Sequence, residues 1–342
     1  MNTPRQLLNR LARRIHDEIH YLFYRSYMSR RAIRRHLACR YTPEATPTVA
    51  VRPTVVFMAD GSRRHGGLAD RLRGIVATYQ YCLEHGLEFR INFTSPFNIE
   101  RYLLPADYDW RLRSGELTFN SGECRPVYLM TTCDHYPERE RRFQRRQLAK
   151  ALSKPFMQAH VYTVYYCADA EFATLFNRLF RPAPNVMQAL ESLREGINGQ
   201  YITISTRFLE LLGDFKEPKT ERRPLPPDRR LRLMEACADE IGRIYSRHRL
   251  PVILTSDSMS FLQYSASRFD FCRFLPGDIS HIDGTEGHQG DSDLKTFVDF
   301  FAVKEAAWSY LIVGEGMYNS NFSRRAAQAD GHPFEVIRIG RS

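Results

Sequence analysis

The chain has 342 residues, of which 43% are hydrophobic and 26% charged, and its formal net charge is +10. These values are ordinary for a globular protein, and no apolar run approaches the roughly 20 residues that a membrane-spanning helix needs. The seven cysteines are scattered without a C-x-x-C pair, which argues against a disulfide framework or a zinc cluster and favours a reducing compartment. Because the N-terminus also lacks the apolar segment of a secretory signal, we expect a cytoplasmic protein.

Most of the positive charge lies at the N-terminus. Residues 1–40 hold ten arginines and two acidic residues, a net charge of +8. Apolar residues recur there at spacings of three or four, which predicts a basic amphipathic helix: Leu8, Leu11, Ile15, Ile19, Leu22 and Phe23. Such a helix can lie on an anionic membrane surface, making the protein peripheral at a membrane, or pack on the rest of the chain. Nucleic acid is not an expected partner. We assign residues 1–45 to this helical segment, with a linker over 41–53.

From Thr54 onward, short apolar runs alternate with helical patterns, which is typical of parallel α/β folds. In the first half we predict strands at 54–59 and 87–93 and helices at 68–86 and 137–152. In the second half we predict strands at 200–207, 251–258, 309–314 and 334–339 and helices at 228–248 and 293–308. The pattern therefore predicts an N-terminal Rossmann-like domain over 46–195 and a C-terminal one over 196–342, facing each other across a cleft.

Polar side chains follow three strands of the second half, where ligands bind in such folds. These are Arg207, Glu210, Asp214, Asp257 and the residues of the loop 315–327. A loop of small polar residues that opens a helix offers main-chain N–H groups to a phosphate, and an arginine can add a charge-assisted contact. A carboxylate there could read guanine through two hydrogen bonds. Each residue also has an ordinary interpretation, as a surface ion pair, a turn residue or a helix cap.

Four short motifs occur in an order that resembles the GDP-fucose-dependent fucosyltransferase superfamily, which includes α-1,6-fucosyltransferases and protein O-fucosyltransferases. They are "GGLADRL" (66–72), "STR" (205–207), "TSDS" (255–258) and "SNFSRRAA" (320–327). Each motif is weak alone, but the ordered set covers roughly residues 54–339. The sequence departs from the family at three positions, where Asp70 replaces an asparagine, Ser205 a histidine and Phe208 an arginine.

The resemblance implies a GT-B-like fold and a role for each matching residue. Arg207, Ser320, Ser323 and the main chain around Asn321 would hold the pyrophosphate, Phe322 would pack near the nucleotide, and Asp257 would recognise guanine. The segment with Gly66, Gly67, Leu68 and Arg71 would face the sugar and β-phosphate. Arg71 and Arg73 could instead pair with Asp70 or Glu84 on a helix surface.

The expected reaction is an inverting transfer of a sugar, fucose from GDP-fucose, to a hydroxyl group of a glycan or a lipid-linked oligosaccharide. The candidates for the base are Asp214, Glu210 and Asp70, in that order, and no metal or other cofactor is expected. One alternative takes "DSD" (291–293) as the metal-binding D-x-D of a GT-A glycosyltransferase, although this segment also suits a helix start. The other is a non-catalytic protein that binds membrane surfaces through its basic N-terminus.

Overall fold

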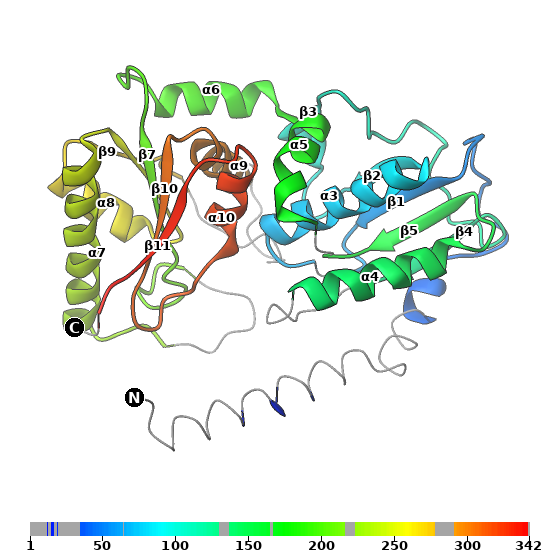
Figure 1. Cartoon of the computed structure of the whole chain (residues 1–342), viewed down its shortest axis with the longest axis horizontal. Coiled ribbons are helices and arrows are strands. Elements are labelled where there is room, and N and C mark those ends of the chain that lie inside the picture. Colours follow the sequence, from blue (N-terminus) through cyan, green and yellow to red (C-terminus); the bar gives the residue numbers. More distant parts are fainter. Residues whose placement is uncertain are drawn as a thin grey trace. The chain divides into compact units, whose positions relative to one another are not determined.

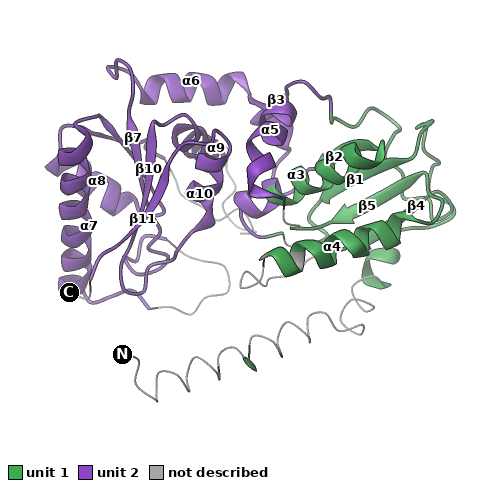
Figure 2. Ribbon diagram, viewed as in Figure 1, with its two compact units in different colours: residues 1–65, 73–92, 110–167 green, residues 66–72, 93–109, 168–342 purple. Residues whose placement is uncertain are grey.

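The computed structural model of the protein describes residues 12, 15, 16, 19, 35–63, 65–129, 137–164, 167–215, 223–277 and 291–340. Of the predicted N-terminal helical segment 1–45, residues 12, 15, 16, 19 and 35–38 are helical and residues 39–45 are described but not helical, while the rest lies outside this range. The chain forms two compact units (Figure 2). Unit 1 comprises residues 1–65, 73–92 and 110–167, and unit 2 comprises residues 66–72, 93–109 and 168–342.

Unit 1 is built on a four-stranded sheet with the order β2-β1-β5-β4 (Figure 1). The strands are β1 (Thr54–Ala59), β2 (Glu88–Phe93), β4 (Cys124–Tyr128) and β5 (Gln158–Tyr162), and β5 pairs in parallel with both β1 and β4. Its helices are α3 (Leu68–His85), of which residues 68–72 belong to unit 2, and α4 (Pro137–Leu152). Helix α3 packs closely on the end of β5, because a Cβ atom on Gly74 would lie 2.4 Å from the carbonyl oxygen of Thr163.

The chain joins unit 1 well before the first strand. Leu37 is fully buried in a cluster with Val56, Met58 and Tyr162. The hydroxyl group of Tyr41 lies 2.8 Å from Nδ1 of His160 in β5, and burial lowers the pKa of this histidine to about 3, so that it stays neutral. Residues 37–41 are therefore part of the fold of unit 1.

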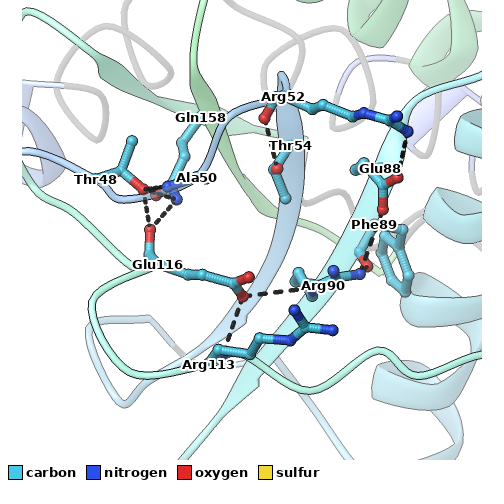
Figure 3. Close-up of polar contacts among 10 residues, drawn as sticks. All are labelled: Thr48, Ala50, Arg52, Thr54, Glu88, Phe89, Arg90, Arg113, Glu116 and Gln158. Atoms are coloured by element: carbon cyan, nitrogen blue, oxygen red, sulfur yellow. Dashed lines mark hydrogen bonds and ion pairs between the residues drawn. The ribbon is translucent and has the colours of Figure 1, made fainter.

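The segment that the sequence suggests is a linker is also docked on unit 1 (Figure 3). The hydroxyl group of Thr48 donates to the carbonyl oxygen of Glu116, at 2.5 Å, and Arg52 forms an ion pair of 3.6 Å with Glu88 of β2. Figure 3 also shows Gln158 of β5 reaching both Thr48 and the main chain of Glu116. These bonds hold residues 48–54 in place, so they do not act as a free linker.

Unit 2 contains a parallel five-stranded sheet with the order β11-β10-β7-β8-β9. Its strands are β7 (Ile202–Thr206), β8 (Val252–Ser256), β9 (Cys272–Arg273), β10 (Trp308–Val313) and β11 (Phe334–Arg338). Helices α7 (Pro227–His248) and α8 (Met259–Arg268) lie on one side of this sheet, and α9 (Asp291–Lys304) and α10 (Asn321–Gln328) on the other (Figure 1).

The alternating sequence of β7 explains why its two faces differ. Ile202 and Ile204 enter the apolar cluster that α7 and α8 complete. Thr203 points the other way, and its hydroxyl group lies 2.6 Å from that of Ser309 in β10. A period of two thus buries one hydrophobic and one hydroxyl-bearing face, as expected of a central strand covered on both sides.

The remaining elements of unit 2 are η1 (Ile99–Arg101), β3 (Leu103–Pro105), α5 (Asp169–Leu179), β6 (Phe180–Pro182) and α6 (Pro184–Leu193). Strands β3 and β6 form an antiparallel pair. The sequence analysis places residues 168–195 in the N-terminal domain, yet they fall in unit 2. Aromatic packing on α9 accounts for this grouping, because Phe176 of α5 lies 5.5 Å from Phe300.

The predicted alternation of strands and helices is confirmed in both halves, with boundaries shifted by at most a few residues. None of the described helices has the length and apolarity required to cross a bilayer. The six cysteines within the described residues are all free thiols.

Candidate functional site

The carboxyl ends of β7, β8 and β10 bring Arg207, Asp257 and the loop before Ser320 together. Strand β7 lies between β8 and β10 and runs parallel to both, so the loops that follow the three strands meet at one edge. Nε of Arg207, after β7, lies 3.3 Å from Oδ2 of Asp257, after β8. The N–H of Tyr318, in the loop after β10, donates to the carbonyl oxygen of Arg207, at 2.9 Å. Arg207 and the loop that leads to Ser320 are therefore neighbours.

The guanidinium group of Arg207 is held from two directions. Its central carbon lies 4.6 Å from the ring centroid of Phe215, and its Nε approaches Asp257. The side chain is 21% exposed, so part of this planar cation can be reached from solvent. An arginine held in this way offers a fork of donors that matches phosphate or carboxylate oxygens. The sequence gives no signal for Phe215, which belongs to no recognisable motif, and it indicates Tyr318 only as part of the loop 315–327.

Asp257 is engaged by the main chain. Its side chain is 1% exposed. Its two oxygens accept hydrogen bonds of 2.7 Å from the N–H groups of Phe208 and Leu209. Leu209 has a φ of 57°, a left-handed conformation that is rare for a residue with a branched side chain. This tight turn directs two consecutive N–H groups at one carboxylate. Burial raises the pKa of Asp257 to about 6, although Arg207 and the main-chain hydrogen bonds act in the opposite direction.

The two carboxylates that follow Arg207 differ in exposure. Glu210 is buried, whereas Asp214 is exposed. Oδ2 of Asp214 accepts hydrogen bonds from the hydroxyl group of Ser258, at 2.8 Å, and from the N–H of Ser260, at 2.9 Å. It thus lies at the N-terminus of α8, where a negative charge is favourable. Of the two base candidates that follow Arg207, Asp214 is therefore the one that solvent can reach.

The N-terminus of α10 is capped by its own serine. The hydroxyl group of Ser320 accepts a hydrogen bond from the N–H of Phe322, at 3.2 Å. Asn321 is exposed, Ser323 is buried, and the Phe322 ring packs edge-on against Phe300 with centroids 5.8 Å apart. The predicted helix start is thus present. Of Ser320, Asn321 and Ser323, Asn321 is the most exposed.

The segment 66–72 has a structural reason for its unusual sequence. Arg71 is buried at 4% exposure, and it donates from Nε to the carbonyl oxygen of Gly66, at 3.1 Å, and from Nη1 to that of Ser95, at 2.8 Å. It therefore does not lie on a helix surface, as one interpretation of the sequence assumed. Leu68 is buried beside it. A role of Gly66, Gly67, Leu68 and Arg71 toward the sugar stays a prediction.

Arg73, the other arginine of this segment, is also buried. Its Nε donates to the carbonyl oxygen of Val164, at 3.1 Å, within unit 1. Both arginines of the D-R-x-R cluster thus donate to main-chain carbonyl oxygens, Arg71 to those of Gly66 and Ser95 and Arg73 to that of Val164.

The two glycines of this segment are not equivalent, and we expect their alanine variants to differ. Gly66 has a φ of 75°, and a Cβ atom there would lie 2.6 Å from Oδ2 of Asp70, whereas a Cβ atom on Gly67 would meet nothing within 4 Å. Gly66→Ala should therefore lower the free energy of unfolding by more than about 1 kcal/mol, and Gly67→Ala by less than about 0.5 kcal/mol. Thermal unfolding of both variants tests this difference, and equal melting temperatures would contradict it.

The D-x-D segment opens a helix. Helix α9 begins at Asp291, and Asp293 is buried at 5% exposure. Within the described part of the chain, no group of three or more His, Cys, Asp and Glu side chains is placed to hold a metal ion.

No protein-family model and no curated protein matches the sequence, but solved structures match the fold. A variant of fucosyltransferase FUT1 from Arabidopsis thaliana, in complex with GDP, has a TM-score of 0.52 at 13% identity, over 95% of this chain and 78% of that one. The fucosyltransferase NodZ from Bradyrhizobium has a TM-score of 0.48 at 16% identity, over 81% and 93%. POFUT1 in complex with GDP has a TM-score of 0.46 at 10% identity, over 86% and 100%. The chain therefore shares the fold of FUT1, and the expected GT-B-like α/β architecture is confirmed.

Proposed function

We propose that the chain is an inverting glycosyltransferase that moves fucose from GDP-fucose to a hydroxyl group of a glycan or glycolipid. One observation carries the proposal. The N–H of Tyr318, in the loop that leads into α10, donates to the carbonyl oxygen of Arg207, at 2.9 Å. This contact lies at the carboxyl edge of a parallel sheet, where doubly wound folds bind nucleotides. The fold that the chain shares with FUT1, which was solved in complex with GDP, supports the choice of donor.

In this mechanism the residues of unit 2 serve the leaving group. As the bond between sugar and diphosphate breaks, negative charge grows on the β-phosphate. The partly exposed guanidinium group of Arg207 and the N-terminal N–H groups of α10 stabilise that charge. A carboxylate takes the proton of the acceptor hydroxyl group, and Asp214 is the first candidate, ahead of Glu210 and Asp70. Since the arginine and the helix N-terminus meet the phosphate charge, no step of this scheme requires a metal ion or another cofactor.

The donor assignment is tested by thermal unfolding of the full chain with GDP, UDP or ADP. A ligand at 100 times its dissociation constant stabilises the folded state by about 2.7 kcal/mol, so GDP should raise the melting temperature by several degrees. The other two nucleotides should raise it less. Release of GDP from GDP-fucose should then continue in EDTA, whereas a GT-A enzyme would need manganese restored. No shift with any of the three nucleotides would contradict the proposal.

The acceptor is proposed to be membrane-borne, a lipid-linked oligosaccharide or another glycan, because the N-terminal segment is strongly basic. A peripheral attachment to an anionic membrane would follow. Since residues 37–41 are docked in unit 1, the appropriate truncation removes residues 1–34 and not 1–45. The full chain should sediment with phosphatidylserine vesicles, and the truncated chain should remain in solution and still bind GDP. If the full chain bound vesicles, lost that binding on truncation and bound no nucleotide in either form, the surface-binding alternative would be favoured.

A further inference from the structure

Asp257 directly follows β8 and lies beside Arg207, and the family resemblance implies that it recognises guanine. We infer that Asp257 is instead a positioning residue, which fixes Arg207 for the diphosphate and does not read the nucleobase. The inference rests on the proposed function, because it concerns how the same site holds its donor. Three sets of contacts within unit 2 support it.

The first set is the engagement of the carboxylate by the main chain. A carboxylate that reads guanine must present both oxygens to the ring N–H and the amino group of the base. In Asp257 both oxygens already accept short hydrogen bonds, from Phe208 and Leu209, and the side chain is 1% exposed. Because only 1% of the side chain is exposed, a base could reach these oxygens only if the residues that cover them moved. If that movement broke the bonds from Phe208 and Leu209, each N–H group left buried without a partner would cost about 1–3 kcal/mol.

The second set links this carboxylate to Arg207 itself. Phe208 and Leu209 directly follow Arg207, so the two hydrogen bonds fix the main chain on its C-terminal side. The contact of 3.3 Å between Oδ2 of Asp257 and Nε fixes the side chain. The closest approach is at Nε and not at the Nη groups, which carry four of the five N–H donors of an arginine. Asp257 therefore orients the guanidinium fork through its inner nitrogen.

The third set holds Arg207 from other directions. The Phe215 ring packs on the guanidinium face, 4.6 Å from its central carbon, and the Tyr318 N–H binds the Arg207 carbonyl oxygen. The residue is thus held at its main chain, its face and its inner nitrogen. If this arrangement exists to aim a cation at phosphate, loosening any of these contacts should weaken diphosphate binding whatever base is attached.

The test is calorimetric titration of the full chain with GDP, ADP and inorganic pyrophosphate, for the parent protein and for Asp257→Asn. The positioning role predicts that the variant loses affinity by a similar factor, about tenfold or more, for all three ligands. A higher KM for GDP-fucose together with a lower kcat for GDP release would also support the positioning role. As a control, Asp228→Asn removes an exposed carboxylate of α7, which pairs with Arg232 at 2.7 Å, and should change nothing.

A second variant keeps the inference testable if Asp257→Asn does not fold. Phe215→Leu keeps an apolar side chain but removes the ring beneath the guanidinium group, and it should lower the affinity for pyrophosphate and GDP by equal, smaller factors. The inference is overturned if either variant binds pyrophosphate as the parent does, and base reading is supported if Asp257→Asn loses affinity for GDP alone. If the parent protein binds none of the three ligands, the proposed function is wrong and the inference falls with it.

Discussion

Replacing Arg207 with alanine is expected to lower the rate of GDP release from GDP-fucose by about 10²–10³-fold, the usual loss when one group that stabilises developing charge is removed. The guanidinium group is the cation that the fold holds at the carboxyl edge of the unit 2 sheet, in contact with Asp257 and Phe215. Hydrolysis of the donor in water can be followed without an acceptor, so the measurement does not depend on knowing the acceptor.

Arg207→Lys separates charge from geometry. Lysine keeps the positive charge but has a single ammonium group, which cannot contact Asp257 and present a fork to phosphate at the same time. We expect its rate to lie between those of the parent and the alanine variant. Arg268→Ala is the matched control, because Arg268, the last residue of α8, forms an exposed ion pair of 2.8 Å with Asp239 of α7. An alanine variant at 207 that melts normally and works within threefold of the parent would rule out the assigned role.

Hydrophobic periodicity predicts some of the apolar strands and helices closely, although it gives no prediction for α5, α6 or α8. The strands over 54–59 and 309–314, and the long helix over 228–248, were predicted within one or two residues of β1, β10 and α7. Strand β5 was missed although all five of its residues are buried. It contains Gln158 and His160, whose side chains bond to Thr118 and Tyr41. Their partners come from segments far along the chain, so the local pattern of β5 looks polar.

The site could be predicted in part, because the geometry of parallel sheets carries information that single residues do not. Knowing that strands 200–207 and 309–314 belong to one α/β half was enough to expect Arg207 near the loop before Ser320. The role of Asp257 was not predictable in the same way. It depends on the left-handed conformation of Leu209, and leucine gives no sequence signal for such a turn.

The same limit applies to the segment 66–72. Its glycines suggest a close approach of a ligand to the main chain. The structure shows that the group close to Gly66 is the carboxylate of Asp70, from the first turn of the following helix. A glycine-rich start to a helix therefore indicates crowding but not its source.

The burial of Asp257 makes the stability of the protein depend on pH. Burial raises the pKa of this carboxyl group to about 6 from an ordinary value of 3.8, and the facing charge of Arg207 offsets that rise only in part. Between the two values the folded protein holds a proton that the unfolded chain has released, so the folded state loses stability as the pH rises. At about 1.4 kcal/mol for each pKa unit, the loss reaches roughly 3 kcal/mol above pH 6.

Asparagine at position 257 does not titrate, so the Asp257→Asn variant should escape this loss. Urea unfolding gives the free energy of unfolding of the parent and the variant at pH 4 and at pH 7.5. Between these two pH values, the variant should gain about 2 kcal/mol of stability relative to the parent. Asp228→Asn, on the surface of α7, should show no such movement. If the difference in free energy of unfolding between variant and parent stays constant, or if the parent gains stability relative to the variant, the carboxylate is not buried as a charge. If the variant does gain stability as expected, the protein retains at neutral pH a carboxylate that weakens its fold. The positioning of Arg207 is the reason that we give for retaining it.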